Sequence, residues 1–124
     1  MTQIEFSATM HSPRTPSDVI NRLCQLAGSS GISAIQVAEN QADFRRGSQA
    51  ALRLKGGIFS KISDFPVVAV VRCDETPTGS TVVIRSLDDL GVGLKFGMQK
   101  KYSEAVRVFG EMLAQMVVSL NASR

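Results

Sequence analysis

The sequence has little of what metal, redox and nucleophilic sites are built from. It contains one histidine, His11, and two cysteines, Cys24 and Cys73, which are far apart and form no Cys-x-x-Cys motif. A zinc site needs several His, Cys or acidic ligands at characteristic spacing, and a redox motif needs a close pair of cysteines. We therefore predict no metal site and no cofactor, and we expect both cysteines to be buried free thiols.

Long hydrophobic runs are also absent. The longest apolar run, Pro66 to Val71, has the length of a strand and falls far short of the roughly 20 residues of a membrane-spanning helix. The opening residues, MTQIEFSATMH, alternate polar and apolar side chains, whereas a secretory signal places an apolar core after basic residues. These features predict a cytoplasmic protein without a membrane span.

Glycines at positions 91, 93 and 97 stand between a β-branched run and a helix-like segment, as they would in a phosphate-binding loop. A dinucleotide fingerprint has the spacing G-x-G-x-x-G and needs a further strand after its helix. Here the spacing is G-x-G-x-x-x-G, one helix follows, and no Gly-Lys-Ser/Thr motif occurs. We therefore interpret the glycines as a turn from the last strand into the last helix.

Size and composition are those of one globular domain. The chain has 124 residues, of which 44% are hydrophobic and 20% charged. A domain of this length buries about two thirds of the surface that its unfolded chain exposes, so it needs no disulfide to fold. No repeat, low-complexity tract or linker divides the sequence. We predict a single domain over residues 1–124.

The first part of the chain predicts a strand followed by a helix. Polar and apolar residues alternate strictly from Gln3 to His11, which is typical of a strand with one face in water. Thr15 is suited to cap a helix that has Pro16 at its first position. Gly28 predicts the end of that helix.

Alternating and β-branched segments then predict five further strands, with a tight turn at Asn40 and Gln41 between the first two. The expected strands are Ser33–Glu39, Ala42–Arg46, Ala50–Lys55, Phe65–Asp74 and Ser80–Leu87. The last segment, Lys100–Leu120, has apolar residues at helical spacing. Gly110 within it is tolerable if the helix comes close to a strand or a second helix there.

This order of elements predicts an α+β fold. We expect a single curved antiparallel β-sheet of about six strands, with a short N-terminal helix and a long C-terminal helix packed on one face. The opening strand IEFSATM, the helix TPSDVINRL with its Pro16 and Val19, and the closing helix after GVGLKFG resemble the helix-grip fold of the START-related superfamily. That group includes lipid-transfer domains and polyketide cyclase-like proteins. The resemblance is one of topology.

The resemblance implies a molecule held between the sheet and the long helix. Members of the superfamily bind apolar or aromatic compounds there, and no catalytic residue is common to them, so none is transferred to this chain. We predict a small non-enzymatic protein that binds an apolar or lipid-like small molecule. The ligand-binding residues expected on the helix side are Phe96, Met98, Phe109, Met112 and Met116. The same side chains would equally serve as core.

Two alternatives stay open. One is a homodimeric interaction module that uses the apolar strand Pro66 to Val71, or an exposed strand edge, and has no small-molecule ligand. The other is an enzyme of the cyclase or isomerase type, for which His11 is the sole candidate base. Asp88 and Asp89 would point to opposite faces of a strand and form no shared-proton pair.

Basic residues cluster around the middle of the sequence at Arg45, Arg46, Arg53, Lys55 and Lys61. Antiparallel pairing could gather several of them on one face that holds phosphates or anionic head groups. The alternative is a solvated sheet face whose charge prevents edge pairing. The net charge of +3 is modest and few aromatics stand among these residues, so we expect no specific nucleic-acid partner.

Overall fold

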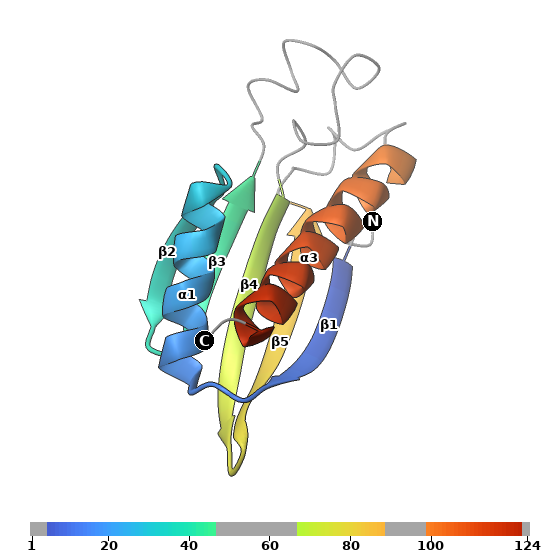
Figure 1. Cartoon of the computed structure of the whole chain (residues 1–124). Helices are drawn as coiled ribbons and strands as arrows, with labels where there is room; N and C mark the ends of the chain where they lie inside the picture. Colours follow the sequence, from blue (N-terminus) through green and yellow to red (C-terminus); the bar gives the residue numbers. More distant parts are fainter. Residues whose placement is uncertain (1–4, 47–66, 89–98, 123–124) are drawn as a thin grey trace.

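The protein is an α+β structure in which two helices cover one face of an antiparallel sheet (Figure 1). The computed structural model describes residues 5–46, 67–88 and 99–122. The elements in chain order are β1 (Glu5–Ser12), α1 (Pro16–Ser29), β2 (Ser33–Ala38), β3 (Gln41–Arg46), β4 (Val67–Thr76), β5 (Gly79–Asp88) and α3 (Gln99–Ala122). The five strands lie in the order β1-β5-β4-β3-β2, and every neighbouring pair is antiparallel.

The predicted fold class is confirmed at this level, although the number of strands differs from the expectation. Five strands are present within the described segments instead of about six. The strand expected at Ala50–Lys55 falls outside those residues. Neither helix in the described part of the chain is both long enough and apolar enough to cross a membrane.

Helix α1 begins as its sequence predicts. The side chain of Thr15 accepts a hydrogen bond from the backbone N–H of Asp18 at 3.4 Å, and Pro16 occupies the first turn, where its missing N–H costs nothing. The end of the helix differs from the prediction. It continues past Gly28 to Ser29, and the residue with positive φ (78°) that redirects the chain is Gly31.

The two hairpins set the register of the sheet. The turn between β2 and β3 is formed by Glu39 and Asn40, one residue earlier than predicted, because the pairing shifts between Gln36 and Ala38. Strands β4 and β5 are joined by a two-residue turn, and Gly79 follows it with a φ of 140°. A Cβ at Gly79 would lie 2.7 Å from Cα of Pro13, so this position requires glycine.

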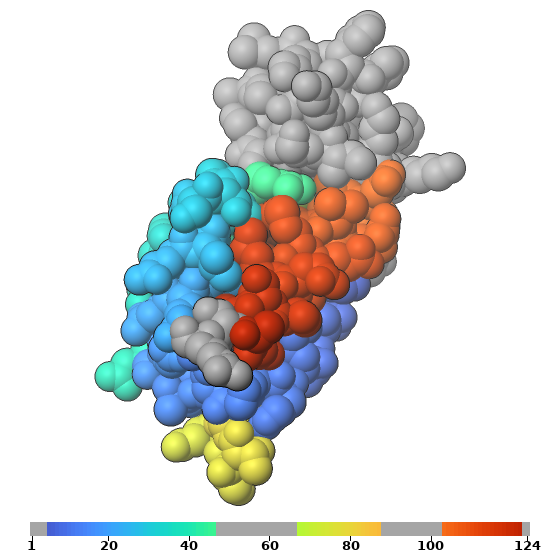
Figure 2. Space-filling view, viewed as in Figure 1, coloured from blue at the N-terminus to red at the C-terminus, as the bar shows by residue number. Residues whose placement is uncertain are grey.

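The hydrophobic core lies between the sheet and the two helices. Alternate residues of each strand face inward, and the helices lie side by side over them (Figure 2). The largest fully buried side chains are Phe44, Phe109, Ile20, Leu23, Ile84, Leu113, Val19, Val67, Val71 and Val82. The opposite face of the sheet carries no helix in the described part of the chain (Figure 1).

Helix α3 comes very close to the sheet at Gly110. This confirms the expectation that a glycine is tolerated within the helix because the helix approaches a strand there. A Cβ built there would overlap the ring of Phe6 and would lie 3.2 Å from Cβ of Ser86. The helix propensity lost by having glycine here, about 1 kcal/mol relative to alanine, is therefore offset by close packing on β1 and β5.

Candidate ligand site between the sheet and the C-terminal helix

Three of the helix-side residues expected to bind a ligand lie on one face of α3. Phe109 is fully buried in the core, and Met112 and Met116 are partly buried and pack against it. Their spacing of three and four residues brings them to the same side of the helix. Phe96 and Met98 lie outside the described residues. The structure therefore brings three of the five residues together, and their binding role stays a prediction.

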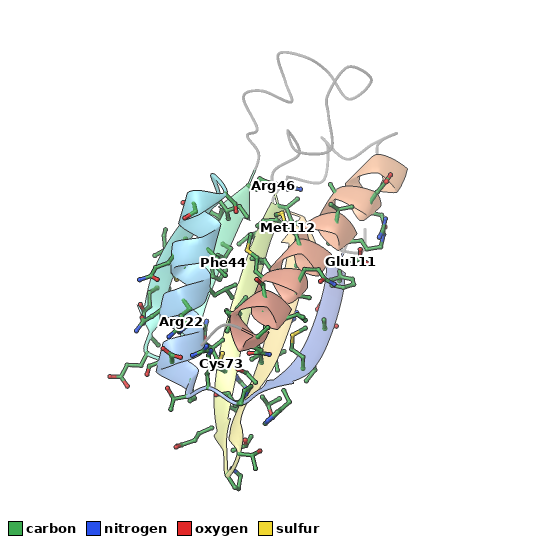
Figure 3. The ribbon with its side chains drawn as sticks, in the orientation of Figure 1. Arg22, Phe44, Arg46, Cys73, Glu111 and Met112 are labelled. Atoms are coloured by element: carbon green, nitrogen blue, oxygen red, sulfur yellow. The ribbon has the colours of Figure 1, made fainter. Side chains whose placement is uncertain are left out.

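Arg46 lies opposite these residues at the end of β3. Strand alternation places it on the inner face together with Ala42 and Phe44, while its neighbour Arg45 is exposed and pairs with Val68 across the other face. The basic residues adjacent in sequence are thus separated onto two faces. Figure 3 shows Arg46 and Met112 close together at the end of the sheet where β3 finishes. Arg53 and Lys55 lie outside the described residues.

The guanidinium of Arg46 contacts aromatic and sulfur groups. Its Cζ atom lies over the ring of Phe109, 5.1 Å from the ring centroid, which is a cation–π contact. Its Nη1 donates to Sδ of Met112 at 3.8 Å, and sulfur is a weak acceptor. The Nε atom is buried and has no hydrogen-bond partner. Burial lowers the pKa of this guanidinium, although not far enough for it to lose its charge near neutral pH.

A second unpaired polar atom lies at the same end of the inner face. Ser86 is buried on β5, and its Oγ has no partner. It belongs to a cross-strand row in which Phe44, Ala69, Ser86 and Phe6 follow one another across four strands. Arg46 is the next residue after Phe44 on the inner face of β3. The inner face of the sheet therefore carries the small side chains of Ala69 and Ser86, and both Ser86 and Arg46 have a polar atom without a partner.

Sequence analysis missed the special position of Arg46 because it treated the basic residues as one cluster. The signal was nevertheless present in the order of residues along β3. Arg46 alternates with Ala42 and Phe44, which are apolar and buried, and so lies on the same face of the strand. Asp43 and Arg45 lie on the other face. When alternate residues of a strand are apolar and the last of them is basic, that basic residue is predicted to lie on the core face.

Two hollows lined by described residues lie away from Arg46. One of about 340 Å³ lies between α1 and α3, where Arg22 is already paired with Asp18 at 3.1 Å. Another, of about 460 Å³, lies beside the start of α1 and is lined by Glu39, Asp74 and Glu75 among others. Within the described segments no group of three or more His, Cys, Asp or Glu side chains could hold a metal ion.

The cysteines and the histidine show no arrangement for nucleophilic chemistry. Both thiols are free; Cys73 is fully buried and Cys24 partly so. Burial, with a smaller contribution from the Asp74 carboxylate, raises the pKa of Cys73 to about 12, and burial also raises that of Cys24. The thiolate is the reactive form, so neither is activated near neutral pH. His11 is exposed, and its backbone carbonyl accepts from Asn121 Nδ2 at 3.3 Å.

No protein-family model matches this sequence, and no curated protein is similar to it. Among solved structures, the chain is similar to protein MLL2253 from Mesorhizobium loti, with a TM-score of 0.61 and 8% identity over 94% of this chain and 95% of that one. This likeness concerns the fold alone.

Two further solved structures are more distant. The di-domain ARO/CYC StfQ from the steffimycin biosynthetic pathway matches with a TM-score of 0.49 and 10% identity, over 96% of this chain and 50% of that one. SA2116 from Staphylococcus aureus, a protein of unknown function, matches with a TM-score of 0.49 and 13% identity, over 96% and 93%.

Proposed function

We propose that the protein is a small non-enzymatic binding protein that holds an apolar or lipid-like molecule between the sheet and α3. The observation that carries this proposal is the inner-face environment of Arg46, which contacts Phe109 and Met112 and leaves Nε without a partner. A site built only for packing would place an apolar side chain there, since a partly buried charge without an oxygen acceptor is costly.

The side chains on α3 are suited to such a site. Met112 and Met116 are partly buried at the boundary of the core, and methionine adapts to varied shapes because it is unbranched and flexible. Phe109, Leu113 and Val117 behind them are fully buried and keep the helix fixed to the sheet. An apolar ligand would thus meet adjustable side chains in front of a rigid core.

The test compares native and denaturing mass spectra of the purified full-length protein. Extra mass that is lost on denaturation supports the proposal and identifies the class of ligand. The protein is then titrated with 1-decanol, a neutral apolar probe. A bare mass together with no uptake of 1-decanol would contradict the proposal. Met116→Lys should weaken uptake, whereas Val118→Lys, on an exposed part of α3, should leave it unchanged.

A homodimer is a second candidate function, favoured by the edge strand β2. Ile35 and Val37 on this strand are 57% and 52% exposed, although strand edges are usually protected by charge. The adjoining helix-free face carries charges of both signs, including Arg72 and Asp43, so it is suited to a second copy of itself.

The mass in solution distinguishes this candidate. Light scattering over a range of concentrations should give twice the chain mass, and Val37→Lys should restore the monomer. Val118→Lys is the matched control because Val118 is also 52% exposed but lies on α3. A monomeric mass at the highest concentration reached would rule out self-association through this edge.

A further inference from the structure

We infer that the ligand is an amphipathic anion, with its acidic group at the guanidinium of Arg46 and its apolar body against Met112. This inference rests on the proposed function and specifies the chemical class of the ligand. Carboxylate, sulfate and phosphate monoester groups share the chemistry that a guanidinium recognises.

The bonding of the other arginines makes Arg46 distinctive. Five further arginines in the described segments each bond an oxygen atom within 3.2 Å, whereas the hydrogen bond of Arg46 goes to sulfur. These five are Arg14, Arg22, Arg72, Arg85 and Arg107. No acidic side chain in the described part of the chain pairs with Arg46, and its pKa is lowered by burial. It therefore retains unused capacity for an oxygen anion.

Its position fits recognition better than structural support. The contact with Phe109 offsets part of the hydration that the guanidinium loses, but an aromatic face supplies no hydrogen-bond acceptor of oxygen type. An arriving anion would provide both the charge and the acceptors. The partly buried Met112 side chain beside it would receive the apolar part of the same molecule, so one end of the site is charged and the rest apolar.

The test is calorimetric titration of the full-length protein near neutral pH with three probes of one chain length: decanoate, 1-decanol and decyltrimethylammonium. We expect decanoate to bind about tenfold or more tightly than 1-decanol, because a charge-assisted hydrogen bond adds to the apolar contact. The cationic probe should bind most weakly, since it meets a like charge.

Three variants locate the effect. Arg46→Met should remove the preference for decanoate over 1-decanol, because methionine keeps an apolar stem but has no group that can bond a carboxylate. Arg45→Met is the control: it makes the same charge change one residue away but on the opposite face of the sheet. Arg46→Lys, which keeps the charge, should retain part of the preference.

The outcomes separate the two proposals. Binding of decanoate and 1-decanol with equal affinity would overturn the inference and leave the proposed function standing, and this comparison needs no variant to fold. Equal loss in Arg45→Met and Arg46→Met would also overturn it, because it would indicate a general charge effect. Failure of all three probes to bind would contradict the proposed function itself and the inference with it.

Discussion

The hydroxyl of Ser12, at the end of β1, donates a hydrogen bond of 2.6 Å to Oδ1 of Asn121, in the last turn of α3. The Ser12 Oγ also accepts from the backbone N–H of Arg14 at 3.2 Å, and Arg14 Nε donates to the carbonyl oxygen of Leu120 at 2.9 Å. These bonds satisfy a buried hydroxyl and one of the carbonyls left unpaired at the end of a helix. The bonds from Ser12 to Asn121 and from Arg14 to Leu120 join residues that are more than 100 positions apart in sequence.

Asn121→Ala should therefore destabilise the fold by about 1–3 kcal/mol, because it leaves the buried Ser12 hydroxyl without its acceptor. Urea denaturation followed by circular dichroism measures the change. Asn21→Ala provides the control, since Asn21 is exposed on α1 and alanine favours helix. A loss no larger for Asn121→Ala than for Asn21→Ala would show that the Ser12–Asn121 bond contributes nothing.

The close approach at Gly110 leads to a second prediction. Gly110→Ala should lower the free energy of unfolding by about 1–2 kcal/mol, since overlap with Phe6 outweighs the gain in helix propensity. Gly28→Ala is a matched control in α1, because a Cβ there meets nothing within 4 Å, and it should stabilise by up to about 1 kcal/mol. If both variants were stabilised, the helix would have room at Gly110 that the structure does not show.

Arg46 and Arg14 should respond oppositely to the same substitution. Arg46→Met is expected to raise the unfolding free energy of the ligand-free protein by roughly 1 kcal/mol, since it removes a partly buried charge without an oxygen acceptor. Arg14→Met should lower it by about 1–3 kcal/mol, because it breaks the bonds to Asp18 and to the Leu120 carbonyl. Thermal and urea unfolding of both variants provide the comparison. A comparable loss in the two would identify Arg46 as structural.

The thiol of Cys73 makes stability depend on alkaline pH. Its pKa is about 12 in the folded protein and 9.0 in its ordinary state, so the unfolded chain loses this proton first as the pH rises. The stabilisation is complete below pH 9 and declines from there towards pH 12, by at most about 1.4 kcal/mol per pH unit. Cys73→Val lacks the group.

The measurement is the difference in unfolding free energy between wild type and Cys73→Val at a series of pH values. All other titratable groups are the same in both proteins, so the difference isolates the thiol. It should be constant up to about pH 9 and then move steadily in favour of the variant. A difference that stays constant through the alkaline range would mean that the folded protein does not protect the Cys73 proton.

Much of the fold follows from local patterns in the sequence. Alternation identified β1, runs of β-branched residues identified β4 and β5, and the combination of Thr15 and Pro16 identified the start of α1. The predicted ends of elements were wrong where tertiary contacts decide between two local conformations of similar energy. The β2–β3 turn moved by one residue because the strands pair with an irregularity, and α1 ends beyond Gly28 because Gly31 supplies the positive φ.

The candidate site was predictable only in part. Helical periodicity placed Phe109, Met112 and Met116 on one face of α3, but periodicity does not say which strand residue faces them. The contact of Arg46 with Phe109 depends on the order of strands in the sheet, and that order cannot be derived from β3 alone.

The strand order also governs how the chain folds during synthesis. Strand β1 leaves the ribosome first, but its partner is β5, so residues 5–12 wait for residues 80–87 before they pair. Closing a loop of that length is slow compared with forming the local β4–β5 hairpin. The hairpin is therefore expected to form as a template to which β1 is added late, and α3 can cover the sheet only after that edge is in place.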